Sequence, residues 1–255
     1  MEMTTERRVA IVTGGSRGIG RGISLALAKA GADVAICFRR DEDAAKSTVA
    51  EIEAMGRKAA AFPADVTDYD KVKEAVAKAV DTFGRIDILV NNAGIASRGQ
   101  YIADTDIEEM HRVMNIHLFG AFHFVQSVLP HMRKQERGDI HFISSMAAAQ
   151  CAAGHGPYAT AKAALEAFAK VLAKEELPNN IRVNAIALGL VETEMGTRLV
   201  KATTGQSIKD IAGGMPFQRV CQPADVGNLC AFLCSDEAGY ISGHVISLDG
   251  GSFRI

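Results

Sequence analysis

The stretch VAIVTGGSRGIGRGISLALAKA, residues 9–30, decides the fold of this chain. Its first five residues form a short β-branched run, which is typical of a buried strand. Gly14, Gly18 and Gly20 follow in a turn, and the apolar periodicity of residues 19–30 then predicts a helix. Because the unpaired amides and the dipole at a helix N-terminus face such a turn, the stretch predicts an anion site that fits a diphosphate.

The same alternation of strand and helix continues along the chain. Further strands are predicted near residues 33–38, 58–62, 87–90, 139–144, 182–187 and 245–248. Helices are predicted near residues 41–55, 68–83, 106–132 and 223–234, with another that begins at about Pro157. The pattern predicts one α/β domain over residues 1–255, a doubly wound parallel sheet (Rossmann fold) with helices on both faces. Only residues 189–215 show weak periodicity, and we expect them to form a mobile flap over the ligand pocket.

Composition excludes several functions. The chain has 255 residues, 48% of them hydrophobic, and a net charge of -2, which argues against nucleic acid or a membrane as its partner. It has no apolar run of about 18 residues and no signal peptide, so we expect a cytoplasmic protein. The five cysteines show no CxxC spacing, and the histidines, including His111, His117 and His123, are interpreted as surface or satisfied residues. We therefore expect no metal site.

A second stretch, SSMAAAQCAAGHGPYATAK, residues 144–162, carries the chemistry. Tyr158 and Lys162 are four residues apart, which places them on one face of a helix. Bringing the pKa of a tyrosine from about 10 to neutrality requires roughly 4 kcal/mol, whereas one solvated lysine contact supplies at most about 1 kcal/mol. Either the site is desolvated or a second positive charge, such as an oxidised nicotinamide ring, lies beside the tyrosine. The pair thus predicts a cofactor.

Four ordered motifs connect the two stretches to a known family. They are TGGSRGIG at residues 13–20, NNAG at residues 91–94, Ser145 thirteen residues before Tyr158, and the YxxxK motif itself. Together they closely resemble the short-chain dehydrogenase/reductase family over essentially the whole chain. The resemblance implies that Tyr158 is the general acid/base and that Lys162 lowers its pKa and holds the nicotinamide ribose. It further implies that Ser145 positions the substrate oxygen, while Asn115 kinks the long helix and supports a water-linked proton relay.

The resemblance also implies a set of cofactor contacts. They are Gly14, Ser16, Arg17, Gly18, Ile19, Gly20, Phe38, Arg39, Asp65, Val66, Asn92, Ala93, Gly94, Tyr158, Lys162, Gly189, Val191 and Thr193. The chain departs from the family at Leu188, where a proline is usual, and we expect the loss of a fixed φ to loosen that turn.

Charge favours NADP(H) as the cofactor. NAD-dependent members usually carry an aspartate at the end of the second strand, whereas this chain has Phe38 there. Arg39 and Arg17 are placed to bind a 2'-phosphate through charge-assisted hydrogen bonds.

The substrate is less determined. The expected pocket residues include no charged side chain, so they favour a small or medium neutral ketone. They are Met146, Gln150, Cys151, His155, Leu188 and Met195. The expected substrate contacts are Ser145, Gln150, Tyr158 and Met195. The chain is similar to 3-oxoacyl-carrier-protein reductases and related ketoreductases, and to glucose and cyclic-alcohol dehydrogenases. A non-catalytic NADP-binding protein and a sugar-nucleotide epimerase or dehydratase remain as alternatives. The family resemblance also implies a homotetramer.

Overall fold

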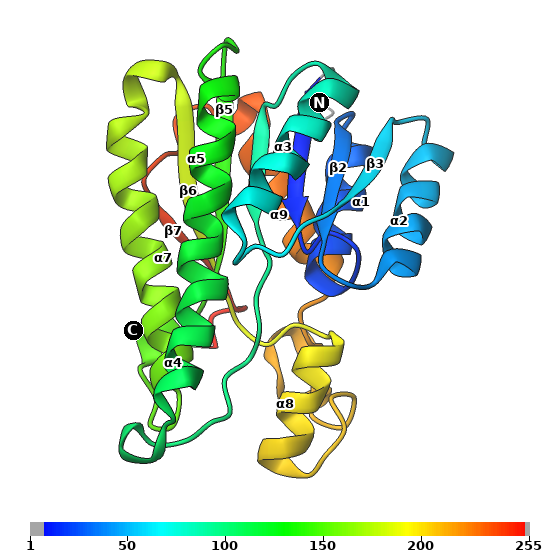
Figure 1. The fold of residues 1–255 in the computed structure, drawn as a ribbon. Coiled ribbons are helices and arrows are strands. Elements are labelled where there is room, and N and C mark those ends of the chain that lie inside the picture. Colours follow the sequence, from blue (N-terminus) through cyan, green and yellow to red (C-terminus); the bar gives the residue numbers. More distant parts are fainter. Residues whose placement is uncertain (1–7, 253–255) are drawn as a thin grey trace.

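Seven strands form one sheet in the order β3-β2-β1-β4-β5-β6-β7 in the computed structural model, which describes residues 8–252 (Figure 1). The strands are β1 (Val9–Thr13), β2 (Asp33–Phe38), β3 (Ala59–Pro63), β4 (Ile88–Asn91), β5 (Gly138–Ser145), β6 (Ile181–Leu188) and β7 (Val245–Leu248). Every neighbouring pair is parallel. The predicted doubly wound parallel sheet is therefore confirmed.

Helices cover both faces of the sheet. They are α1 (Gly18–Lys29), α2 (Glu42–Ala54), α3 (Tyr69–Phe83), α4 (Ile107–Met114), α5 (Gly120–Met132), α6 (Ala147–Gln150), α7 (Gly156–Glu175), α8 (Glu194–Thr204) and α9 (Pro223–Cys234). One apolar core joins the sheet to α1, α2 and α9, and a second joins it to α3, α5 and α7. Since both faces are covered, strands β1, β2, β4, β5 and β6 are buried over nearly their whole length. Two of them appear in the sequence as apolar runs, at residues 9–12 and 34–38.

Glycine allows α1 and α9 to pack closely. A Cβ on Gly22 would lie 2.4 Å from the Pro223 carbonyl oxygen, and a Cβ on Gly227 would lie 2.3 Å from the Gly22 carbonyl oxygen. Neither distance is possible for a real side chain, so this crossing requires glycine in both helices.

The segment expected to be a weakly structured flap contains a helix. Thr193 caps α8 by accepting a hydrogen bond from the Gly196 amide at 3.0 Å. Val200 packs with Ile208 and Val220 in a small apolar cluster separate from the two main cores. Figure 1 shows α8 in yellow beyond the carboxyl ends of the strands, where it forms a compact extension of its own.

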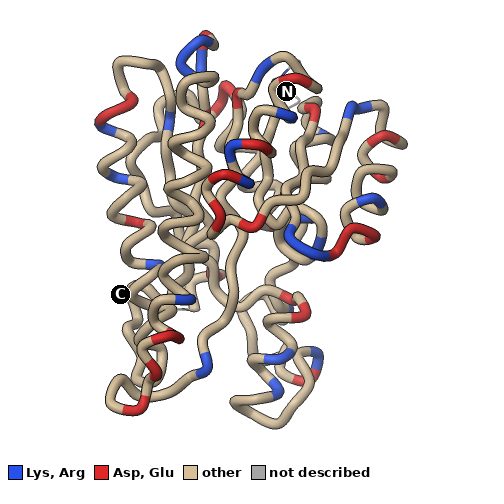
Figure 2. Tube along the Cα trace, in the orientation of Figure 1, with Lys and Arg blue, Asp and Glu red and all other residues tan. Residues whose placement is uncertain are grey.

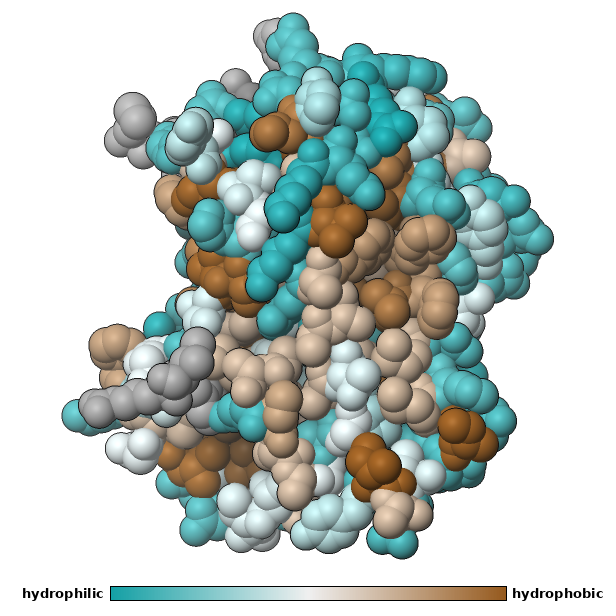
Figure 3. All heavy atoms as spheres, turned by 90° about the vertical axis from the view of Figure 1, so that its left-hand side faces the viewer, coloured by the Kyte–Doolittle hydropathy of each residue, from teal (hydrophilic) through white to brown (hydrophobic). Residues whose placement is uncertain are grey.

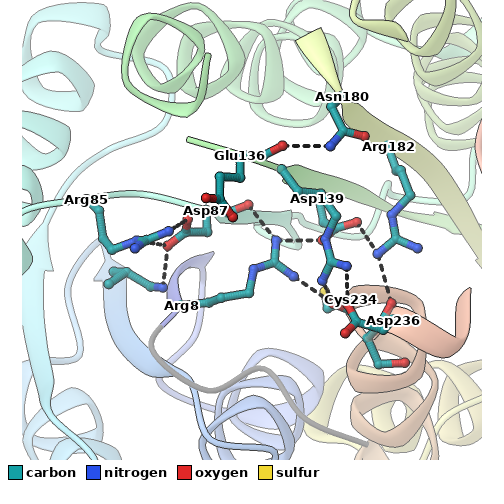
Figure 4. A network of polar contacts seen from close by, with 12 residues as sticks. Arg8, Arg85, Asp87, Glu136, Asp139, Asn180, Arg182, Cys234 and Asp236 are labelled. Carbon is teal, nitrogen blue, oxygen red and sulfur yellow. Dashed lines mark hydrogen bonds and ion pairs between the residues drawn. The ribbon is translucent and has the colours of Figure 1, made fainter. Parts of the chain in front are cut away.

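Buried charges hold together the amino ends of the central strands, on the side of the sheet away from α8 (Figure 4). Asp139, at the start of β5, pairs with Arg8 at 2.6 Å and with Arg182 at 2.7 Å. Arg8 also donates to the Cys234 carbonyl at 2.6 Å, and Arg182 donates to the Ser235 carbonyl at 3.1 Å. These contacts join the first strand, the two strands β5 and β6, and the end of α9.

Elsewhere the charges are mixed in sign along the surface elements (Figure 2). Within residues 8–252, no helix combines the length and the apolar character needed to cross a membrane. The same residues contain no cluster of three side chains suited to hold a metal ion.

Candidate active site

The candidate site lies where the strand order reverses. β1 and β4 are neighbours, yet the chain leaves them toward opposite sides of the sheet. Their carboxyl ends carry Thr13 and Asn91, and the next strand, β5, ends at Ser145. A doubly wound sheet binds its ligand at this point, because the two connections diverge and leave a crevice.

The glycine turn is locked onto the loop that follows β4. Asn92 donates its side-chain amide to the Thr13 carbonyl at 2.9 Å. The Thr13 hydroxyl accepts the Asn92 and Ala93 amides, each at 2.9 Å. Sequence analysis did not select Thr13, although its position as the last residue before the glycines was the available signal. The hydroxyl holds the two predicted cofactor segments in one arrangement.

The same turn fits a diphosphate. Gly14 and Gly18 have φ values of 63° and 54°, which favour glycine. A Cβ on Gly20 would lie only 2.0 Å from the Gly14 carbonyl oxygen, so the first turn of α1 packs directly on the loop. No side chain caps the first amides of α1, which leaves them available to an anion. The residues present therefore fit a dinucleotide.

The end of β2 gathers positive charge around the expected adenosine side. Phe38 is buried, whereas Arg39 and Arg40 are exposed. Desolvation raises the pKa of Asp65. Hydrogen bonds from Thr67 and the positive charges of both arginines together lower it by more, so the net shift of the pKa is downward. Arg40 is an addition to the residues that the sequence indicated.

Arg17 already has acidic neighbours. Its guanidinium lies 4.0 Å from an Asp41 oxygen and 3.6 Å from a Glu194 oxygen, and all three side chains are largely exposed. Exposed pairs of this kind contribute little free energy, so they leave Arg17 free to rearrange toward a phosphate.

The base of the flap lies next to the glycine turn. A Cβ on Gly18 would lie 3.6 Å from the Thr193 methyl group, which places this predicted cofactor contact across the crevice. Val191 forms an isolated bridge with Cys221. Leu188 ends β6 and pairs with both Ser145 and Leu248. Leu188, at the position where the family usually has proline, is thus paired with a neighbouring strand on each side.

The remaining predicted cofactor contacts are packed inward. Ser16 is buried, and its carbonyl accepts the Thr48 hydroxyl at 3.0 Å. Val66 packs on Gly120, where a Cβ would lie 2.6 Å from a Val66 methyl carbon. Ile19 packs against the core beneath α1, and a Cβ on Gly189 would lie 3.1 Å from the Asp249 Cα.

Ser145, Tyr158 and Lys162 are brought together. The Ser145 hydroxyl hydrogen-bonds Tyr158 and is itself held by the Ala147 amide at 3.2 Å. Lys162 is 4% exposed and donates to the Ile143 carbonyl at 2.6 Å. Its nitrogen lies 5.6 Å from the centre of the Tyr158 ring. The serine and the tyrosine therefore present two hydroxyls at the end of β5, with the lysine directly behind them.

Burial opposes charge on both Tyr158 and Lys162. It raises the pKa of Tyr158, and the Ser145 hydrogen bond offsets only part of that rise. Burial lowers the pKa of Lys162 to about 7, although the charge of Glu166 acts in the opposite direction. Desolvation thus works against a tyrosinate, so of the two routes considered from the sequence only the second positive charge would lower the Tyr158 pKa. Without it, Tyr158 keeps the proton that a general acid needs.

The long helix is interrupted at the expected place. Between α4 and α5 lies a π helix, η2 (Asn115–Phe119). Asn115 is exposed at its first position, and its part in the site stays a prediction. His117 is 2% exposed, and its ring meets the Tyr158 ring edge-on at 5.4 Å. The interpretation of His117 as a surface or satisfied residue is corrected, since its Nδ1 is buried without a partner among the described residues.

The expected pocket residues fall into two groups. Gln150, Cys151 and Met195 are exposed, and His155 is half-buried at the start of α7. Met146 and Leu188 are 3% and 5% exposed and belong to the protein interior. That these six residues line one pocket stays a prediction.

A loop that the sequence did not indicate lies beside the Tyr158 helix. A Cβ on Gly156 would lie 2.2 Å from the Ile102 Cδ1 atom, and one on Gly154 would lie 3.2 Å from the Gly99 carbonyl oxygen. Ile102 nevertheless remains 70% exposed. The loop thus places an exposed apolar side chain beside the start of α7.

Comparison with known proteins agrees with this geometry. Residues 14–252 match the family model described as enoyl-(acyl carrier protein) reductase. The chain belongs to the short-chain dehydrogenase/reductase family. Among other short-chain dehydrogenases/reductases, it is 38% identical to the 3-oxoacyl-[acyl-carrier-protein] reductase FabG of Thermotoga maritima, over 98% of this chain and 99% of the relative. It is 37% identical to the oxidoreductase UcpA of Salmonella typhimurium, over 96% and 94% of the two chains.

Solved structures of short-chain dehydrogenases/reductases share the fold. A 7 alpha-hydroxysteroid dehydrogenase complexed with NADH and 7-oxo glycochenodeoxycholic acid superimposes with a TM-score of 0.90 at 32% identity, covering 100% of this chain and 97% of that one. A short-chain dehydrogenase from Burkholderia cenocepacia in complex with NADP gives a TM-score of 0.88 at 35% identity, covering 96% and 98%. Both nicotinamide cofactors thus occur among similar structures.

The buried Lys162 predicts a pH-dependent stability. Its pKa falls from 10.5 to about 7 on folding, so between these values the unfolded chain binds the extra proton and stability rises with pH. Lys162→Met removes this contribution, so wild type should gain stability relative to the variant from pH 7.5 to 9.5, by at most about 1.4 kcal/mol per pH unit. Urea unfolding of both cofactor-free proteins measures the difference. Lys170→Met, at an exposed position on the same helix, is the control, and a wild-type advantage that does not change with pH would contradict the expectation.

Proposed function

We propose that this chain is an NADP(H)-dependent oxidoreductase that interconverts a ketone and a secondary alcohol. The observation that carries the proposal is the grouping of the Ser145 and Tyr158 hydroxyls at the end of β5, backed by the buried Lys162. Two hydroxyls that can both donate to one oxygen suit a substrate carbonyl. A binding protein that only sensed the cofactor would have no need of this pair.

The roles of the residues follow from their protonation. Ser145 donates to the carbonyl oxygen and orients it. Tyr158, neutral at physiological pH, transfers its proton to the same oxygen as negative charge develops there. Lys162 would hold the nicotinamide ribose and stabilise the tyrosinate left behind. The nicotinamide, when bound, supplies the hydride to the carbonyl carbon, so proton and hydride together reduce the ketone to the alcohol.

A 3-oxoacyl thioester or a small or cyclic ketone is the proposed substrate class. Support comes from the name of the Thermotoga maritima relative and from the similar structure with a bound 7-oxo compound. Ile102, Met195 and Leu199 expose apolar side chains on the loop next to α7 and on α8. A neutral, largely apolar ketone suits this arrangement better than a sugar, which leaves the glucose-type alternative weaker.

Replacing Tyr158 tests the reaction. NADPH absorbance should fall with at least one substrate in a panel of acetoacetyl thioesters, cyclic ketones, diketones and sugar lactones. Tyr158→Phe should lower kcat by about 10²- to 10⁴-fold, because it removes the proton donor. Tyr240→Phe, at a fully exposed tyrosine, is the matched control and should leave kcat unchanged. Tight NADPH binding by wild type without turnover of any ketone or alcohol would favour a non-catalytic binding protein.

Replacing Arg39 tests the cofactor preference. Arg39→Ala should raise the KM for NADPH about tenfold or more, because one charge-assisted hydrogen bond to the 2'-phosphate is lost, and should leave the KM for NADH nearly unchanged. Arg57→Ala is the control, since Arg57 pairs with Asp33 at the amino end of the same strand. Equal effects of Arg39→Ala on both cofactors would count against an NADP(H) enzyme.

We also propose a homotetramer, in which the α5–α7 face forms one interface. Phe122 and Val171 are 41% and 54% exposed on these helices, and Figure 3 shows apolar residues spread over this side of the molecule. Light scattering during gel filtration should give four chains for wild type and fewer for Val171→Lys, which places charges at the interface. A monomeric wild type at micromolar concentration would contradict the proposal.

The proposed cytoplasmic location is supported by the five free cysteines.

A further inference from the structure

We propose that His117 is a positioning residue of the active site. Its neutral imidazole fixes the plane of the Tyr158 ring and the backbone of the loop after β4. This inference rests on the proposed function, because it concerns the same reaction.

The first contact is with the catalytic phenol. The two ring centres are 5.4 Å apart and their planes are inclined by 89°, so the rings meet edge-to-face. Such contacts favour a defined orientation and contribute about 0.5–1.5 kcal/mol beyond simple burial. Because His117 is 2% exposed, neighbouring atoms prevent its ring from turning away. The orientation of Tyr158 therefore depends on the ring beside it.

The second contact is with the loop that carries predicted cofactor residues. His117 Nε2 lies 2.8 Å from the Ile95 carbonyl oxygen and 3.1 Å from the Ile95 amide nitrogen. A Cβ on Gly94 would lie 2.5 Å from His117 Cε1, so the ring packs flush on that backbone. One imidazole thus sits between the phenol and the loop, and couples their positions.

His117 also borders a small cavity of about 10 Å³, which Asn91 and Thr13 help to line. Within residues 8–252, His117 Nδ1 and both polar atoms of the Asn91 side chain are buried without a hydrogen-bond partner. The volume is close to the minimum that holds one water, and unpaired polar atoms of this kind favour one. We infer a water that joins Asn91 to Nδ1 and so fixes the second nitrogen of the imidazole.

The charge state of the His117 imidazole argues against a role as a catalytic acid or base. Burial, followed by the positive charges of Lys162 and Arg112, lowers the pKa of His117 to about 3, although its hydrogen bond to Ile95 acts in the opposite direction. The groups that face it are Tyr158, Lys162 and Arg112, and none is an anion at neutral pH. The imidazole is therefore neutral throughout the working range, and it acts by holding other groups.

Three variants test the assignment by their kinetics. His117→Leu should lower kcat about 10- to 100-fold with little change in KM, because a small misplacement of the acid is costly. His117→Asn should recover most of the loss, since a carboxamide can donate to the Ile95 carbonyl and accept from the water. His111→Leu, at an exposed histidine on α4, is the matched control and should behave as wild type.

The pH profile separates positioning from general damage to the fold. In alcohol oxidation Tyr158 must be deprotonated, and an apolar neighbour makes that harder, so His117→Leu should shift the rising limb to higher pH. The other groups that face Tyr158, Ser145 and Lys162, are unchanged in this variant. Thermal melts accompany each protein, and His117→Met replaces the leucine variant if that one does not fold. Wild-type kcat in His117→Leu, or an equal loss in His111→Leu, would overturn the proposal.

A second measurement does not depend on turnover. Nitrogen NMR of the histidine-labelled, cofactor-free protein should show His117 neutral from pH 5 to 9, with no titration near its ordinary pKa of about 6.5. The His117→Asn spectrum identifies the signal by its loss. A His117 that titrates in this range would overturn the proposal, whereas a wild type without turnover of any ketone would overturn only the proposed function.

Discussion

The buried amine of Lys162 constrains everything around it. An ammonium group removed from water needs a partner, and the Ile143 carbonyl, 2.6 Å away, is the acceptor that β5 provides. That distance requires α7 to approach the sheet closely, which the buried alanines at 159 and 161 permit. Once the helix lies there, Tyr158 is held one turn earlier at the end of the strand, beside Ser145. The catalytic group is thus a consequence of how α7 packs.

The same burial sets the chemistry. In the cofactor-free protein the tyrosine keeps its proton and the lysine is only weakly basic. A positive nicotinamide ring near Tyr158 would favour the tyrosinate, and the tyrosinate in turn would favour the protonated form of Lys162. Acid and base forms of the tyrosine would then alternate with the redox state of the cofactor, which suits an enzyme that works in both directions. Neutral groups beside the phenol, such as His117, avoid disturbing this balance with a charge of their own.

Much of this architecture could be predicted from residues alone, because strands buried on both faces give unbroken apolar runs such as residues 9–13 and 33–38. The glycine turn could also be predicted. Its glycines are required by the fold, because any Cβ on Gly20 would collide with the Gly14 carbonyl oxygen, and so they stand out in the sequence. The helix α8 was missed because it packs on a small cluster of its own, with little apolar periodicity. The loop that carries Ile102 was missed because its one 3-10 turn, Ile102–Asp104, is too short to give a pattern.

His117 was missed for a different reason. A lone histidine gives no sign of burial in the sequence, and η2 interrupts the regular helical spacing on which such a prediction depends. Gly94 gave the one hint, because a glycine beside a buried ring is needed where backbone and ring touch.

The most direct test of the account is a single turnover of an acetoacetyl thioester by enzyme with NADPH already bound, followed in water and in heavy water. If Tyr158 passes its exchangeable phenolic proton to the carbonyl oxygen during reduction, the fast loss of NADPH absorbance should be slower in heavy water. Identical rates in the two solvents would contradict the assignment of Tyr158 as the acid in the reducing step.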